Sequence, residues 1–122
     1  MHIHELTTPA ALVDTARMTH NIQTMQQRMN HLGVAFRPHV KTTKCIDIAQ
    51  VQIAAGAKGI AVSTLKEAEQ FFAAGINDIL YAVGMVAPKL NQAAALIQRG
   101  CALKIIADSI ESVRFNTISN DL

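Results

Sequence analysis

Apolar residues recur at helical spacing in four stretches of the chain, and each stretch ends at a glycine. The glycines are Gly33, Gly56, Gly75 and Gly100. The apolar side of the first stretch consists of Met18, Ile22, Met25, Met29 and Leu32. These residues follow each other in steps of four and three, which is the period of one helix face, and we expect this face to pack into the core. A terminal glycine closes a helix by adopting the left-handed conformation, so the pattern predicts four helices.

A short strand-like run follows each of these glycines. The runs are Val34 to Val40, Lys58 to Val62, Asp78 to Val83 and Leu103 to Ala107. Strands that alternate with helices predict βαβ units and a parallel sheet. Asp14 is the predicted N-cap of the first helix, and Thr64 with Glu67 forms a capping-box pattern before the third. A last helix, from about Ser109, is expected to weaken after Val113 because poor helix formers follow.

Four βα units in 122 residues suit either half of a (β/α)₈ barrel or a small open sheet. A complete barrel needs roughly 250 residues. Half a barrel leaves strand edges exposed, so the chain looks unfinished. We therefore expect an α/β fold in which residues 1–122 form a single partial domain.

Composition and charge exclude several classes of function. Half of the residues are apolar and 16% are charged, and 11 Lys+Arg against 9 Asp+Glu leave a net charge of +2. This near-neutral chain is unsuited to nucleic-acid binding by bulk electrostatics, and it lacks the run of about 18 apolar residues that spans a membrane. The N-terminus lacks the pattern of a signal peptide, and the two cysteines form no disulfide framework. We expect a cytoplasmic protein without nucleic-acid or membrane partners.

The first predicted strand carries the residues with the most distinctive chemistry. Side chains alternate between the faces of a strand, so Arg37, His39 and Lys41 share one face. Cationic groups are costly to bury without partners, which points to an anionic ligand. Lys41 stands at the carboxyl end of the strand, where active sites of parallel α/β folds form. A lysine whose pKa is lowered there forms a Schiff base with a carbonyl; the alternative is an exposed lysine in a basic turn with Lys44.

Pro38 is a difficulty for this predicted strand, because proline has no N–H to donate to a sheet. A bulge or bend just before Lys41 would reconcile the proline with the strand. The sequence leaves these alternatives open.

Several segments resemble one family of pyridoxal-phosphate enzymes. Thr8-Pro-Ala-Ala-Leu-Val-Asp14 looks like the start of enzymes with the alanine racemase type of barrel. Arg37-Pro-His-Val-Lys-Thr-Thr-Lys44 resembles the segment that holds the cofactor lysine in the D-threonine aldolase and D-serine dehydratase group. The likeness continues through Ala54-Ala-Gly-Ala-Lys-Gly-Ile60 and extends to about Val113. One departure is Thr43, where the family motif usually has histidine.

The resemblance implies a fold, a cofactor and a reaction. The fold would be the N-terminal portion, about four βα units, of an alanine racemase-type (β/α)₈ barrel, with the rest of the barrel and a β domain absent from this chain. Lys41 would be the catalytic residue that bonds pyridoxal 5′-phosphate, with His39 and Arg37 in the cofactor site. The substrate would be a small D-3-hydroxy amino acid, cleaved or dehydrated with a divalent metal whose ligands lie outside this chain.

Other interpretations remain. The chain is alternatively a truncated, non-catalytic remnant, or part of a racemase or decarboxylase of the same fold type. On its own it is expected to be inactive, and two copies pair edge to edge as a homodimer in one version of the remnant hypothesis. A third alternative is an open α/β module that holds a phosphate with Arg37, His39, Lys41 and Lys44.

Overall fold

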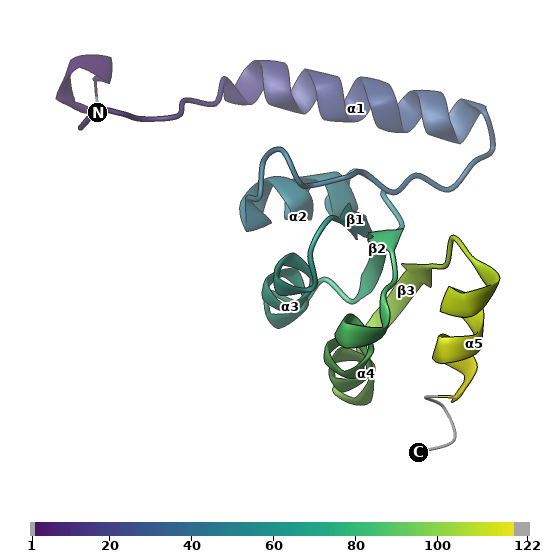
Figure 1. The fold of residues 1–122 in the computed structure, drawn as a ribbon. Coiled ribbons are helices and arrows are strands. Elements are labelled where there is room, and N and C mark those ends of the chain that lie inside the picture. The colour runs from purple at the N-terminus through teal and green to yellow at the C-terminus, as the bar shows by residue number, and fades with distance from the viewer. Residues whose placement is uncertain (1, 119–122) are drawn as a thin grey trace.

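A parallel three-stranded sheet in the order β1-β2-β3 lies at the centre of the molecule (Figure 1). The strands are β1 (Ile60–Val62), β2 (Asp78–Gly84) and β3 (Ala102–Ile106). The helices are α1 (Thr15–His31), α2 (Ile46–Ala54), α3 (Leu65–Ala73), α4 (Leu90–Gln98) and α5 (Ile110–Ile118), with short 3₁₀ turns at Ile3–Glu5 and Ala87–Lys89. The computed structural model describes the backbone of residues 2–118 and the side chains of residues 2–114. This order of elements confirms the predicted α/β fold and parallel sheet.

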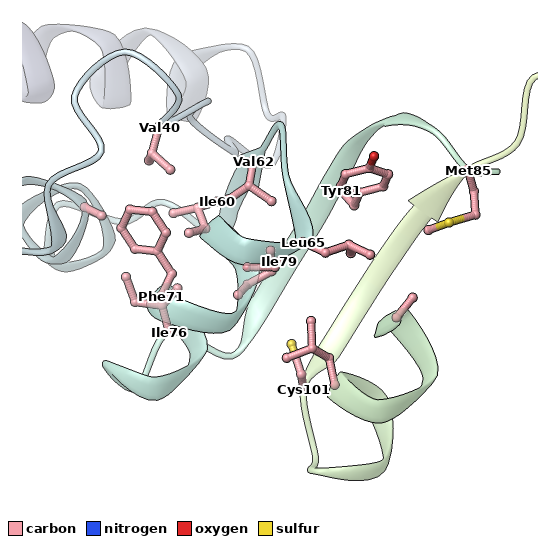
Figure 2. Packing of buried hydrophobic residues seen from close by; sticks show 14 residues of the cluster. Val40, Ile60, Val62, Leu65, Phe71, Ile76, Ile79, Tyr81, Met85 and Cys101 are labelled. Carbon is pink, nitrogen blue, oxygen red and sulfur yellow. The ribbon is translucent and has the colours of Figure 1, made fainter. Parts of the chain in front are cut away.

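The hydrophobic core lies between the sheet and helices α3 and α4 (Figure 2). In the parallel register Ile60 pairs with Ile79 and Val62 with Tyr81, so these side chains point to the same side of the sheet. All four are fully buried and meet Phe71 of α3 in one cluster. Each such side chain contributes about 1.5–3 kcal/mol when it leaves water, so this face of the sheet holds the fold together.

The opposite face of the sheet, called the open face below, is less covered. Its register places Ala61 beside Leu80, and Leu80 beside Lys104. Lys104 is exposed, and Ile106 at the end of β3 is 40% exposed. Polar side chains on this face therefore remain accessible to a ligand.

Local sequence patterns predicted several helix ends correctly. The carboxylate of Asp14 accepts a hydrogen bond from the N–H of Arg17, and Thr64 and Glu67 form the predicted capping box. The four glycines after the helices all have positive φ, and at Gly33 it is +67°. The last helix, α5, reaches Ile118 and includes Asn116, while the other poor helix formers, Ser119, Asn120 and Asp121, lie outside the described residues.

The prediction of a strand from Val34 to Val40 is wrong. The segment is extended beside β1 but makes one isolated bridge, between His39 and Ala61. Within that bridge the N–H of Ala61 donates to the carbonyl of Pro38, and the N–H of Val40 donates to the carbonyl of Ala61. Pro38 has no N–H to donate toward Gly59, so the regular ladder is interrupted there, and the next hydrogen bond between the two segments runs from the N–H of Lys58 to the carbonyl of Phe36 at 2.9 Å.

The prediction that the apolar stripe of α1 is ordinary core is also wrong, although Met18, Ile22 and Met29 are half-buried. Met25 and Leu32 are 44% and 59% exposed, and Gln26 is the buried residue of α1. Its side chain packs against Gly56, where an added Cβ would lie 3.3 Å from the Gln26 amide. The Gln26 amide also donates to Asn30 at 2.7 Å. The helix therefore contacts the rest of the fold through a polar side chain.

No helix among the described residues is long and apolar enough to cross a membrane.

Candidate active site at the carboxyl edge of the sheet

His39, Lys41 and Ser63 meet where the extended segment and β1 end. Ser63 directly follows β1, and the His39–Ala61 bridge brings the two segments side by side. The N–H of Lys41 donates to Nδ1 of His39 at 3.2 Å, and Nε2 of His39 lies 3.4 Å from Oγ of Ser63. Because Nδ1 accepts, Nε2 carries the ring proton and donates to the serine hydroxyl.

The surroundings of His39 favour the neutral form of its imidazole. Partial burial, followed by the positive charge of Lys41, lowers its pKa, while the negative charge of Glu67 opposes the shift. A neutral ring retains the acceptor at Nδ1 that the backbone of Lys41 uses. The histidine therefore orients the lysine-bearing backbone.

The amine of Lys41 is exposed and unpaired within the part of the chain that the structure describes. Most other lysine amines there are engaged with a carboxylate or, for Lys89, with the hydroxyl of Tyr81. Besides Lys41, the exception is Lys58, which precedes β1 and therefore lies near the amino-terminal ends of the strands, opposite to the end where Lys41 lies. Lys41 is thus the accessible amine at the edge where parallel α/β folds place their chemistry.

The turn after Val40 holds Lys41 in place. The N–H of Val40 is bonded to β1, and the N–H of Lys44 donates to the carbonyl of Val40 at 2.9 Å. Lys44 has a φ of +45°, and its amine lies 3.1 Å from the carboxylate of Glu67 on α3. Burial disfavours the charge of Glu67, but hydrogen bonds from the N–H of Ser63 and from Lys44 outweigh it and lower the pKa of the carboxyl.

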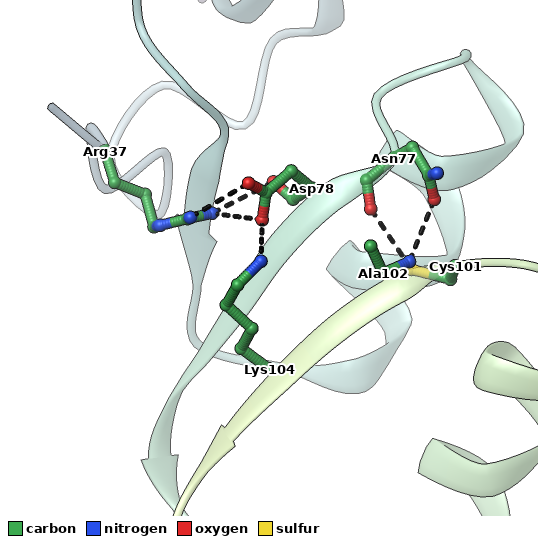
Figure 3. A network of polar contacts seen from close by, with 6 residues as sticks. All are labelled: Arg37, Asn77, Asp78, Cys101, Ala102 and Lys104. Carbon is green, nitrogen blue, oxygen red and sulfur yellow. Dashed lines mark hydrogen bonds and ion pairs between the residues drawn. The ribbon is translucent and has the colours of Figure 1, made fainter. Parts of the chain in front are cut away.

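Arg37 shares the open face with His39, but its guanidinium is already paired (Figure 3). It contacts both carboxylate oxygens of Asp78 at 2.7 and 3.0 Å and also donates to the Asp78 carbonyl at 3.2 Å. Lys104 of β3 contacts the same carboxylate. The chain itself therefore supplies the anion that the sequence led us to expect from a ligand of Arg37. The guanidinium beside Asp78 lowers the pKa of that carboxyl to about 2.

Comparison with known proteins identifies the family. Residues 13–115 match the family described as alanine racemase, N-terminal domain. The chain belongs to this family. It is 60% identical over 109 residues to D-threo-3-hydroxyaspartate dehydratase of Delftia sp. (strain HT23), covering 89% of this chain and 29% of that protein. It is 34% identical over 106 residues to D-threonine aldolase of Arthrobacter sp, covering 87% of this chain and 28% of that protein.

Similarity extends to D-serine dehydratase of Dictyostelium discoideum, with 36% identity over 117 residues that cover 92% of this chain and 29% of that protein. The solved structure of the Delftia sp. HT23 dehydratase matches with a TM-score of 0.93 and 56% identity, covering 96% of this chain and 31% of that one. The chain thus spans less than a third of the length of these relatives. The resemblance seen in the sequence and the assignment to part of an alanine racemase-type fold are both confirmed.

The sequence does not reveal the distant contacts of two residues at this edge. Ser63 follows the second predicted strand, where its hydroxyl suits either a helix cap or a cofactor, and its contact with His39 depends on a pairing between segments 24 positions apart. Glu67 was recognised only for its local capping box, although it also reaches Lys44. A carboxylate three residues after a cap residue gives no sign of a second, distant partner. Within the described residues no three His, Cys, Asp or Glu side chains gather as a metal site requires.

Proposed function

We propose that this chain is the N-terminal part of a pyridoxal-phosphate-dependent lyase for D-3-hydroxy amino acids, with Lys41 as the covalent anchor of the cofactor. The observation that carries the proposal is the unpaired Lys41 amine at the carboxyl edge of the sheet, in a segment shared with the family. Bound pyridoxal phosphate supplies the electron sink for breaking a bond of the amino acid.

The residues at this edge fit the covalent attachment of that cofactor. An aldehyde reacts with an amine that is accessible and free of a tight ion pair, as Lys41 is. His39 is neutral and fixes the backbone of Lys41 through Nδ1, and Ser63 holds the ring by its other nitrogen. These contacts would limit how far the lysine moves while its amine bonds to or leaves the cofactor. A cofactor-binding role for Arg37 would require the guanidinium to act from within its pair with Asp78.

Dehydration is the reaction branch that we favour. The identity to the Delftia dehydratase is 60%, against 34% to the Arthrobacter aldolase. The substrate would then be a D-3-hydroxy amino acid that loses its hydroxyl, with D-threo-3-hydroxyaspartate as the first compound to assay. A divalent metal near the hydroxyl, a homodimer, a single partial domain and a cytoplasmic location stay predictions.

Borohydride reduction of the chain mixed with pyridoxal phosphate, followed by peptide mapping, tests the anchor. We expect the label on Lys41 and its loss in Lys41→Met. Lys58→Met is the matched control, because Lys58 is the other unpaired lysine of the described chain, at the opposite edge. Labelling spread over many lysines, or retained in Lys41→Met, would contradict the proposal and favour the non-catalytic remnant.

A further inference from the structure

Glu67 connects two parts of the molecule that the sequence separates, the turn that carries Lys41 and the start of α3. One carboxylate oxygen accepts hydrogen bonds from the N–H groups of Ser63 and Thr64, at 2.9 and 3.2 Å. The other oxygen lies 3.1 Å from the amine of Lys44. The Glu67 side chain is only 8% exposed. A carboxylate this buried costs free energy unless an opposite charge lies beside it, and among the described residues Lys44 supplies that charge for this oxygen.

Lys44 needs such a partner because of its backbone. Its φ of +45° lies in the left-handed region, which a lysine rarely adopts. Its N–H closes the turn onto the carbonyl of Val40, and Lys41 lies inside that turn. A residue in this conformation persists only where its surroundings hold it. Among the described residues, Glu67 is the partner of the Lys44 side chain.

We propose that Glu67 is a positioning residue for Lys41. Through its ion pair with Lys44 it keeps the turn of residues 40–44 closed, and the closed turn keeps the Lys41 amine at the carboxyl edge of the sheet. This inference rests on the proposed role of Lys41 as the cofactor anchor. His39 fixes the backbone of Lys41 from one side of the turn, and Glu67 fixes the turn from the other.

The chain offers a matched control on the same helix. Glu69 of α3 is also 3.1 Å from a lysine amine, that of Lys66, but this pair lies on the surface and contacts no part of the turn. Glu67→Gln removes the charge that Lys44 pairs with and keeps an oxygen for the Ser63 and Thr64 amides. Glu69→Gln makes the same chemical change without touching the turn.

The first measurement is the apparent affinity for pyridoxal 5′-phosphate, followed by the visible absorbance of the covalent adduct. We expect Glu67→Gln and Lys44→Gln each to weaken binding about tenfold, and the double variant to weaken it no further, because both remove one interaction. Lys44→Arg keeps a cation for Glu67 and should retain most of the affinity. Glu69→Gln should stay within about twofold of the parent chain.

The second measurement needs no cofactor. Hydrogen exchange of the amides in residues 40–44, at a temperature where circular dichroism shows every variant folded, should be faster in Glu67→Gln and unchanged in Glu69→Gln. Unchanged affinity in Glu67→Gln, or losses that add in the double variant, would overturn this inference and leave the role of Lys41 intact. A parent chain in which pyridoxal phosphate does not label Lys41 would overturn the proposed function and this inference together.

Discussion

At the residue scale, Asp78 determines which charges on the open face are available to a ligand. Its carboxylate takes both nitrogens of the Arg37 fork and the amine of Lys104. Of the three basic residues that the alternation of the first segment placed on one face, only His39 and Lys41 remain for other chemistry. Spacing in the sequence predicted the shared face correctly for Arg37. It could not identify an aspartate 41 positions later as the partner.

The same aspartate predicts a dependence of stability on pH. The pKa of Asp78 is lowered from 3.8 to about 2, so the unfolded chain binds the proton more readily than the folded one. Its stabilising effect is therefore complete above pH 3.8 and is lost as the pH falls through the folded value. Solvent screening at this half-exposed site leaves roughly 1 kcal/mol. Urea unfolding at about pH 6 and about pH 2.5 should show this loss in the parent chain and a smaller one in Asp78→Asn; equal losses would contradict it.

Gly59 gives a second prediction at this scale. A Cβ at this position would lie 2.3 Å from the carbonyl oxygen of Asp78 and 2.4 Å from the Arg37 guanidinium. Gly59→Ala should therefore cost about 3 kcal/mol, because the backbone oxygen cannot move aside. Gly33→Ala is the control: Gly33 has a φ of +67° and nothing within 4 Å, so its cost is only about 1 kcal/mol of backbone strain. The free energy of unfolding of both variants decides, and a smaller cost at Gly59 would be inconsistent with the close approach.

At the scale of elements, local rules located the helices better than the first strand or the face of α1. Helix ends depend on neighbouring residues, so Asp14, Thr64 and the terminal glycines were sufficient to place them. The first strand failed because one residue, Pro38, removed a donor from the ladder. The apolar stripe of α1 identified the helix, but its buried face centres on Gln26 against Gly56, with Ile22 and Met29 of the stripe only half-buried. That face is set by contacts with a segment thirty residues away in the sequence.

The contribution of the Thr64 cap of α3 to stability can be tested. Thr64→Ala removes the side-chain oxygen that accepts from the N–H of Glu67 at 3.0 Å, and we expect a loss of about 1 kcal/mol in the free energy of unfolding. Thr64→Ser keeps the acceptor and should retain most of that stability. Glu67 contacts Thr64 at this cap and also pairs with Lys44. Thr64→Ala should therefore also speed hydrogen exchange in residues 40–44. Equal stability of the alanine and serine variants would argue against the cap.

At the scale of the whole molecule, the fold has one closed face and one open face. Tyr81, Ile79 and their neighbours close the first against α3 and α4, while Lys104 and Ile106 leave the second accessible. The four predicted βα units suited either half a barrel or an open sheet, the family resemblance implied part of a barrel, and the match to less than a third of each relative's length agrees with that part. The carboxyl edge of the sheet combines access with anchoring. Lys41 lies beside the open face, and its segment is anchored to the core through the buried Val40.

The unpaired edge of strand β3 predicts self-association of the chain. Within the described residues β3 pairs with β2 alone, so its other edge presents unpaired backbone groups next to Ile106, which is 40% exposed. Such an edge is a template for pairing with a second copy, and a charge placed on it opposes the pairing. Sedimentation velocity at increasing concentration should show association of the parent chain and a marked reduction in Ile106→Lys. Ile97→Lys, at a 51% exposed site on α4, adds the same charge away from the edge and should associate like the parent. Equal association of all three chains would place the contact elsewhere, and a parent that stays monomeric would mean that twist or side chains protect the edge.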